Sequence, residues 1–283
     1  MYNVLIHEIA KYIPHDIVYD GVEAPYIFNL EKRLLVFIES SREEKGRSYY
    51  QSRFLLAKSL GIHLITIFDV DWFNNQEKII SYLHSLFPPQ IRIFARKCEV
   101  VKIDNEVACA FVDKYHLQGA NRSTMKINYG LVHEGKLLAV MSFGKLRLKH
   151  TNDGQYELHR FAVKDHYSIA GGASKLYKAF EREYSPKYVL SYSDNDIFLG
   201  GVYSKLGFSC SGQCTPRYYW MYFAKELKRE QCQLKRLKIQ YPDLYEEAYE
   251  VGASNKEIYI MHRLGAKQIW RSGNTKWEKM YVQ

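Results

Sequence analysis

A corner of small residues near the middle of the chain has the composition of a phosphate-binding turn. Ser168-Ile-Ala-Gly171-Gly172-Ala173-Ser174 precedes KLYKAFEREY, which has helical periodicity. The first amides of a helix have no partner within the helix, and the helix dipole makes that end positive, so a pyrophosphate can bind there. Glycine and alanine permit its approach. We therefore expect these residues to bind a phosphate-bearing cofactor, although most glycine-rich helix starts bind nothing.

Polar side chains at the ends of nearby elements have the chemistry of proton transfer. His116 ends an expected helix in KYHLQG, and its unperturbed pKa lies near neutral pH, so it is a candidate general base. In the expected strand LSYSD, alternation places Ser191 and Ser193 on one face and delivers Asp194 at the end of the strand. Capping or core roles for His116 and a turn cap for Asp194 are the alternatives.

The first ninety residues read as a β-α-β unit. Residues 34–40 and 61–72 each contain an apolar run typical of a buried strand, and residues 49–61 between them have helical spacing that ends at Gly61. Two strands joined by a helix predict a parallel pair. A further helix over residues 75–87 stops at Pro88 and Pro89, which mark the best domain boundary.

The pattern changes beyond this boundary. We expect a helix over residues 105–115, a hairpin with its turn at HEGK, a strand at YELHRFAVK, the corner and its helix, a strand at KYVLSYSD, a short helix, and a final strand at PRYYWMYF. Residues after 223 read as one basic helix with a leucine stripe, followed by irregular structure. The expected domains are therefore residues 1–90, 91–223 and 224–283.

Charge and aromatic content favour a polyanionic partner. Forty Lys and Arg against 31 Asp and Glu leave a net charge of +9 and a pI near 9.1, together with 24 Tyr, 14 Phe and 4 Trp. Lysine and arginine contact phosphates and aromatic rings stack on bases, so the combination suggests nucleic acid, most simply double-stranded DNA, although a basic protein without such a partner stays open. The candidate contacts are Arg92, Arg96, Lys97, Arg160, Lys225, Lys228, Arg229, Lys235 and Arg236.

The remaining composition points to the cytoplasm. Five scattered cysteines lack paired spacing, which argues against a zinc ribbon and against a disulfide framework. We find neither an export signal nor a membrane-spanning stretch, so a membrane partner is not expected.

The order of elements over residues 100–223 resembles the acetyltransferase (GNAT) superfold. The corner is similar to that family's pyrophosphate turn, (Arg or Gln)-x-x-Gly-x-(Gly or Ala), with Ser168 in place of the basic or amide residue. The stretch VYSKLGF resembles a segment near the end of such domains, and the resemblance implies that Tyr203 is a general acid toward the departing thiolate. It also implies acetyl-CoA, or a related acyl or aminoacyl donor, as cofactor.

Several short stretches between residues 94 and 208 resemble the phage Mom-type DNA-modification proteins, which modify adenine. They are ARKCEVVKI, KYHLQG, YELHRFAV, GGASKLYKAF, LSYSDND and GGVYSKLGF. The resemblance implies a transferase that acts on nucleic-acid bases.

The N-terminal unit resembles the nuclease-like module fused to such proteins, related to Vsr-type and PD-(D/E)xK, or homing-type, endonucleases. FIES, GIHL and IFDVDW carry the likeness, and Glu39 occupies the acidic position of a Mg²⁺ site. The companion positions fall near Tyr50 and Arg53, which cannot complete such a site, so we expect this unit to have lost cleavage. The function expected is thus base modification by His116, Tyr203, Ser191 and Asp194. A Mg²⁺-dependent endonuclease and a non-catalytic nucleic-acid-binding protein are the alternatives.

Overall fold

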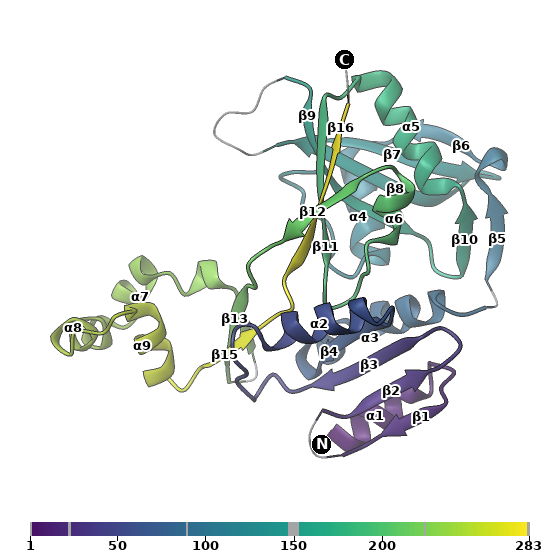
Figure 1. Ribbon diagram of the computed structural model, residues 1–283. Helices are drawn as coiled ribbons and strands as arrows, with labels where there is room; N and C mark the ends of the chain where they lie inside the picture. The colour runs from purple at the N-terminus through teal and green to yellow at the C-terminus, as the bar shows by residue number, and fades with distance from the viewer. Residues whose placement is uncertain (1, 22–23, 89, 147–152, 224, 282–283) are drawn as a thin grey trace.

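The chain forms a mixed α/β structure with three regions, which Figure 1 shows as an N-terminal unit below a large sheet and a group of helices to one side. This computed structural model describes residues 2–21, 24–88, 90–146, 153–223 and 225–281. Within these ranges, no helix has both the length and the apolar character needed to cross a membrane.

The N-terminal unit is a four-stranded sheet in the order β1-β2-β3-β4 with three helices. Its elements are α1 (Tyr2–Ala10), β1 (Ile17–Tyr19), β2 (Tyr26–Asn29), β3 (Leu34–Glu39), α2 (Tyr49–Ser59), β4 (His63–Phe68) and α3 (Asp69–Ser85). The expected parallel pair β3–β4 and the helix between them are confirmed. Helix α3 is kinked at Asn75, where φ is −139° and ψ is 29°, so the helix expected from residue 75 follows a short first helical segment that DVDW begins directly after β4.

A seven-stranded sheet in the order β12-β16-β11-β9-β8-β7-β6 forms the centre of the molecule. Its elements and helices are β6 (Glu99–Lys102), α4 (Asn105–Tyr115), β7 (Ile127–His133), β8 (Lys136–Lys145), β9 (Gln155–Val163), α5 (Gly172–Tyr184), β11 (Tyr188–Asp194), α6 (Gly201–Lys205), β12 (Ser209–Gln213) and β16 (Asn274–Met280). The expected helix 105–115 and the hairpin turning at HEGK are confirmed, and the helix expected over residues 171–184 is found at residues 172–184.

Alternating residues of β8 explain why one helix covers each face of this sheet. Val140 packs with the apolar side of α4, whereas Met141 and Phe143 pack with α5. Phe143 stacks on Phe180 of α5 with ring centroids 3.8 Å apart. Because both faces are covered, the sheet is an interior layer that can hold a site at its strand ends.

The sheet is completed by a strand that the sequence reading missed. Residues 274–280 were expected to be irregular but form β16, which pairs antiparallel with β11 on one side and β12 on the other. In turn PRYYWMYF, the expected final strand of this sheet, belongs to a different one. The central sheet is therefore discontinuous in sequence, and a division of the chain at residues 90 and 223 stays a prediction.

The third region combines a small sheet with three helices. Its elements are β13 (Tyr218–Tyr222), β14 (Lys225–Leu227), η2 (Arg229–Gln231), α7 (Leu234–Gln240), α8 (Pro242–Glu250), α9 (Lys256–Arg263) and β15 (Lys267–Trp270). The expected single basic helix is wrong, because β14 pairs with β13 and the helical run starts only at Leu234. The leucine stripe nonetheless docks: Leu237 is buried in the core of this region, with Leu227 and Leu234 packed against it.

Two further contacts join the regions into one body. Tyr50, Phe68 and Val70 of the N-terminal unit share a core with Tyr219, Met221 and Ile269 of the small sheet. The loop after β11 reaches the free edge of β4, where the Thr66 amide donates to the Asp196 carbonyl at 2.7 Å.

Replacement of Trp277 in β16 tests the role of this strand. Trp277 is 5% exposed and Met280 on the same strand is 79% exposed. We expect Trp277→Ala to lower the free energy of unfolding by about 3–5 kcal/mol, because it leaves a cavity in the core. Met280→Ala is the control and should change it by less than about 0.5 kcal/mol. Urea denaturation followed by circular dichroism measures both. Equal stabilities would show that β16 is dispensable.

Candidate active site

Strands β9 and β11 run parallel and then part, which opens the central sheet. Their ladder covers only Tyr188–Leu190 against Gln155–Glu157. At the point of separation, the Ser191 hydroxyl donates to the Leu158 carbonyl at 2.7 Å. On its other edge, β9 carries a bulge, since Ser142 pairs with Arg160 and Phe143 with Leu158, leaving His159 without a partner in the ladder. Beyond the split, the edge of β9 that faces β11 has no strand to bond to, a common arrangement beside active sites.

A cavity of about 360 Å³ occupies the opening, and we call it the β9–β11 cleft. Its walls are aromatic and polar in similar measure, with Arg160 and Phe161 from β9, Ser193 and Asp194 from β11, and Tyr203 from α6. The loop before α6 closes it.

Gly200 at the start of α6 must be glycine. Its φ is +78°, and a Cβ there would lie 2.2 Å from the Trp277 ring. Only glycine permits both the left-handed backbone and this close approach. The cleft wall at Gly200 is therefore packed directly against the Trp277 ring.

Tyr203 is held in the cleft by β16. Its ring stacks on Trp277 with centroids 5.4 Å apart, and the Trp277 indole donates to Ser193 at 2.9 Å. The Tyr203 hydroxyl donates to the Tyr192 carbonyl at 3.1 Å. Burial raises the pKa of Tyr203, so its hydroxyl keeps its proton at neutral pH and is a donor.

His116 lines the same cleft, but its protonation differs from the sequence expectation. Burial, with smaller contributions from Arg160 and Lys78, lowers the pKa of His116 to about 3. Its Nδ1 accepts a hydrogen bond from the backbone N–H of Gln118 at 3.2 Å, which assigns the ring proton to Nε2. A neutral imidazole with Nε2–H donates a hydrogen bond. It is too weak a base for the general-base role that its ordinary pKa suggested.

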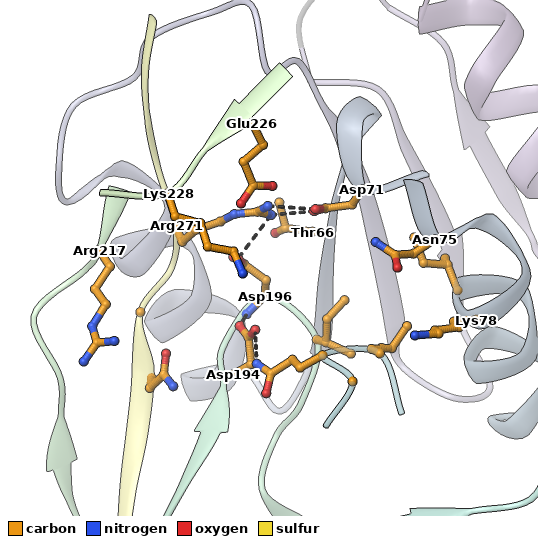
Figure 2. Close-up of a pocket in the computed structure, with 17 residues that line it drawn as sticks. Thr66, Asp71, Asn75, Lys78, Asp194, Asp196, Arg217, Glu226, Lys228 and Arg271 are labelled. Atoms are coloured by element: carbon orange, nitrogen blue, oxygen red, sulfur yellow. Dashed lines mark hydrogen bonds and ion pairs between the residues drawn. The ribbon is translucent and has the colours of Figure 1, made fainter. Parts of the chain in front are cut away.

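A second and more polar cavity, of about 510 Å³, lies where the three regions meet, and we call it the polar cavity. Figure 2 shows Asp194, Asp196 and Arg271 at its centre, with Lys78 and Arg217 on opposite sides. Asp194 and Gln118 line both cavities, and the side-chain amide of Gln118 donates a hydrogen bond to the Asp194 carboxylate at 2.9 Å. The two cavities therefore meet at this contact.

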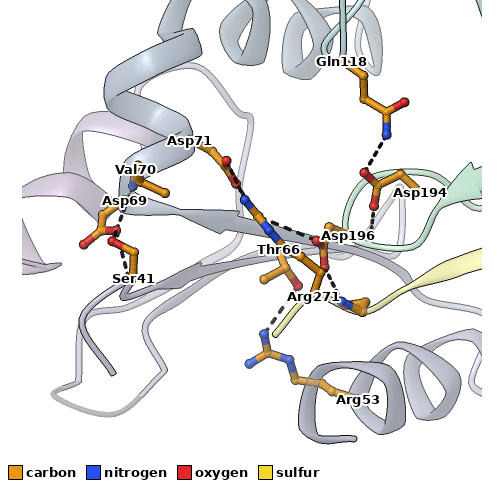
Figure 3. Close-up of polar contacts among 11 residues, drawn as sticks. Ser41, Arg53, Thr66, Asp69, Val70, Asp71, Gln118, Asp194, Asp196 and Arg271 are labelled. Atoms are coloured by element: carbon orange, nitrogen blue, oxygen red, sulfur yellow. Dashed lines mark hydrogen bonds and ion pairs between the residues drawn. The ribbon is translucent and has the colours of Figure 1, made fainter. Parts of the chain in front are cut away.

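A chain of polar contacts leads from Asp194 to the N-terminal unit (Figure 3). The Asp196 amide donates to the Asp194 carboxylate at 3.0 Å, and the Asp196 carboxylate accepts the Ser272 amide at 3.1 Å. Arg271 lies 3.7 Å from Asp196 and forms two hydrogen bonds with Asp71, at 2.5 and 2.8 Å. Burial raises the pKa of Asp194, and burial together with the Asp194 charge raises the pKa of Asp196 to about 7.

The glycine corner starts a helix, as expected, but stands apart from these cavities. Gly171 is exposed with φ +79° and precedes α5, and strand β10 (Tyr167–Ala170), which contains Ser168, pairs with β5 (Ile91–Phe94). Neither Ser168 nor any of Gly171, Gly172, Ala173 and Ser174 lines the β9–β11 cleft or the polar cavity.

The basic candidates fall in two exposed groups, with one exception. Arg92, Arg96 and Lys97 lie on β5 and the short helix after it, beside the corner, and Lys225, Lys228, Arg229, Lys235 and Arg236 lie between β14 and α7. Arg160 is the exception, because it lines the β9–β11 cleft and donates to the carbonyls of Gly119 and His159 at 2.8 Å each. Only Lys228 of the first two groups lines the polar cavity.

The structure gives no support to a magnesium site at Glu39. Its carboxylate forms an ion pair with Arg53 and accepts the Tyr50 hydroxyl at 3.3 Å, so the two companion positions expected from sequence lie beside it and Arg53 offsets its charge. Among the residues that the structure describes, no group of three His, Cys, Asp or Glu side chains could hold a metal ion.

Sequence reasoning missed Asp71, Asp196 and Arg271. The spacing of Asp194 and Asp196 in SDND at a strand end was a usable signal. Arg271 had none, because its partners lie 75 or more residues away in sequence.

In sequence comparisons, no family model and no curated protein matches the chain. Among solved structures, it is similar to a GNAT family acetyltransferase from Brucella melitensis in complex with acetyl-CoA, with 16% identity over 40% of this chain and 82% of that one, at a TM-score of 0.32. An IAA acetyltransferase from Bacillus cereus has 14% identity over 65% and 99% of the two chains, at a TM-score of 0.35. An acetyltransferase from Bacillus subtilis in complex with CoA has 12% identity over 66% and 100%, at 0.36. These scores are too low to support an argument about function, which has to come from the geometry of the site.

Replacement of Asp196 by Asn tests the buried carboxylate pair. A pKa raised from 3.8 to about 7 means that the folded state holds more protons than the unfolded state between these pH values. The ionised carboxyl therefore costs stability, and the free energy of unfolding falls as pH rises through this window.

We expect the Asp196→Asn variant to lack that part of the decline, since an amide does not titrate but can still accept the Ser272 amide. Asp243→Asn, at an exposed position of α8, is the control. Urea denaturation at four pH values between 4 and 8 measures the difference from wild type. A difference that does not change with pH would show that Asp196 titrates normally.

Proposed function

We propose that this protein is an acyltransferase-type enzyme whose donor and acceptor meet at Asp194. The observation that supports it is the contact between two cavities at the Asp194–Gln118 pair, in an opening between two parallel strands. A two-substrate transfer needs two sites that share one reacting point, and it needs groups there that can move protons.

The β9–β11 cleft fits the acyl end of a thioester such as acetyl-CoA, or a related acyl or aminoacyl donor. The unpaired edge of β9 beyond Leu158 offers backbone groups to an amide-containing arm, and Phe161 and Tyr203 offer apolar surface. Such a donor supplies an activated acyl group when bound. The residues that hold it are those of β9, the start of α6 and the loop at His116.

Three side chains take distinct roles toward the reacting atoms. Asp194, whose pKa is raised by burial, accepts a proton from the acceptor's N–H on the side of the polar cavity. Tyr203 keeps its proton and donates it toward the leaving sulfur. His116, with its proton on Nε2, donates a hydrogen bond toward the acyl oxygen.

We further propose that the acceptor is a base of a nucleic acid, most simply double-stranded DNA. The net charge of +9 supports this. So do Lys78, Arg217 and Lys228, which line the polar cavity together with Asp71, Asp194, Asp196 and Glu226 and form no ion pair with a carboxylate in the described part of the chain. The amide side chains of Gln118 and Asn274 line the cavity and have the donors and acceptors that read a base edge.

Asp194→Asn tests the proposed base. We expect it to lower the rate of acyl transfer by about 10²–10⁴-fold, the usual contribution of general acid–base catalysis, with little change in coenzyme A binding. Duplex DNA incubated with acetyl-CoA and the protein is digested to nucleosides and weighed, while released thiol is followed spectroscopically. Asp243→Asn is the matched control and should retain the wild-type rate.

The two readouts separate the two parts of the proposal. Release of thiol without any change in nucleoside mass would keep acyl transfer and overturn the nucleic-acid acceptor. Wild-type protein that neither releases thiol nor binds coenzyme A saturably would leave a non-catalytic binding protein.

A further inference from the structure

A third cavity, of about 200 Å³, extends from the β9–β11 cleft toward the end of β9. The two share Tyr82, His116, Phe161 and Phe198 in their walls, so they are neighbours along one strand. The rings of Tyr82 and Phe198 pack edge to face with centroids 5.2 Å apart at this junction. We call it the lysine cavity, after Lys78 of α3, Lys114 of α4 and Lys164 just after β9, and Lys78 lines the polar cavity as well.

The lysine cavity has an excess of positive charge. Asp165 is its one carboxylate, and it accepts a hydrogen bond from Ser81. In the ranges that the structure describes, no carboxylate forms an ion pair with any of the three lysines, and their ammonium groups have no hydrogen-bond partner there. Lys114 and Lys164 lie near the rings of Tyr115 and Tyr167, at 5.4 and 6.0 Å. Unpaired ammonium groups converging on one cavity suit a phosphate group.

The distance along β9 matches a phosphate at this end of the donor. From His159 at the bulge to Lys164, the strand spans roughly 16 Å at about 3.3 Å per residue. The pantetheine arm of coenzyme A separates its sulfur from its diphosphate by a chain of comparable length. A donor whose acyl group lies at the bulge and whose arm follows β9 therefore brings its diphosphate to Lys164.

The glycine corner is the alternative location, and the structure argues against it. Strand β5 runs beside it and pairs with β10. Lys175, in the first turn of α5, donates to the carbonyls of Ala95 and Cys98 and so points away from an incoming anion. The corner residues line none of the three cavities.

We propose that the lysine cavity binds the diphosphate of the acyl donor, in place of the glycine corner. This inference rests on the proposed function, since it needs a donor in the β9–β11 cleft. In this proposal Lys114 and Lys164 bind the diphosphate, because Ser168 stands where the family's pyrophosphate turn has a basic or amide residue.

Calorimetric titration with two probes tests it. Coenzyme A carries the diphosphate, and pantetheine is the same arm without it. We expect the double variant Lys114→Ala/Lys164→Ala to bind coenzyme A about tenfold or more weakly, as loss of charge-assisted contacts implies, and pantetheine as wild type does. The decline of coenzyme A affinity with salt should also become shallower. Lys136→Ala/Lys238→Ala removes the same charge from exposed positions elsewhere and is the matched control.

Each of the other outcomes contradicts one part of the proposal. Unchanged coenzyme A affinity in the double variant overturns the lysine cavity while leaving the donor cleft intact. A loss caused instead by Arg96→Ala/Lys97→Ala returns the diphosphate to the corner. Failure of wild-type protein to bind either probe overturns the proposed function itself. Thermal melting of every variant confirms that these surface changes leave the fold in place.

Discussion

The contacts of the Arg271 guanidinium join the three regions of the molecule. It forms two hydrogen bonds with Asp71 on α3, approaches Asp196 after β11, and lies over the rings of Phe68 and Tyr219 at 4.3 and 4.7 Å. These partners come from the N-terminal unit, the central sheet and the small sheet. Arg271 and Asp71 are partly buried, with side chains 22% and 28% exposed, so their attraction is screened less than that of a fully exposed pair. Arg271, Asp71 and Asp196 all line the polar cavity, so this contact joins its walls.

Local pattern was sufficient where an element is stabilised by its own sequence. The helices at 105–115 and 172–184 and the hairpin at HEGK were predictable from periodicity and turn residues. Strand β16 was not, because NTKWEKM contains few apolar residues and its pairing with β11 joins residues some 80 positions apart. The basic stretch after residue 223 misled for the same reason. Its first residues pair with β13, a tertiary contact that charge and leucine spacing do not encode.

The site shows the same division. Asp194, Tyr203 and His116 were identifiable as residues, and they share one cleft. Their chemistry was less accessible, since it depends on burial and on single hydrogen bonds. The backbone N–H of Gln118 decides which nitrogen of His116 carries the proton, and the side chain of Gln118 donates a hydrogen bond to Asp194. One short loop therefore sets the polarity of both groups, which residue type alone could not reveal.

The place of β16 between β11 and β12 has a consequence for how the molecule is made. A ribosome releases residues in order, and upstream units can fold while downstream ones are still being synthesised. The N-terminal unit and most of the central sheet are complete in sequence long before Trp277, which supports Tyr203, has been added. Until β16 has been added, the edge of β11 away from β9 is unpaired and β12 has no partner strand. The cleft wall that Trp277 supports therefore forms only after this residue has been added.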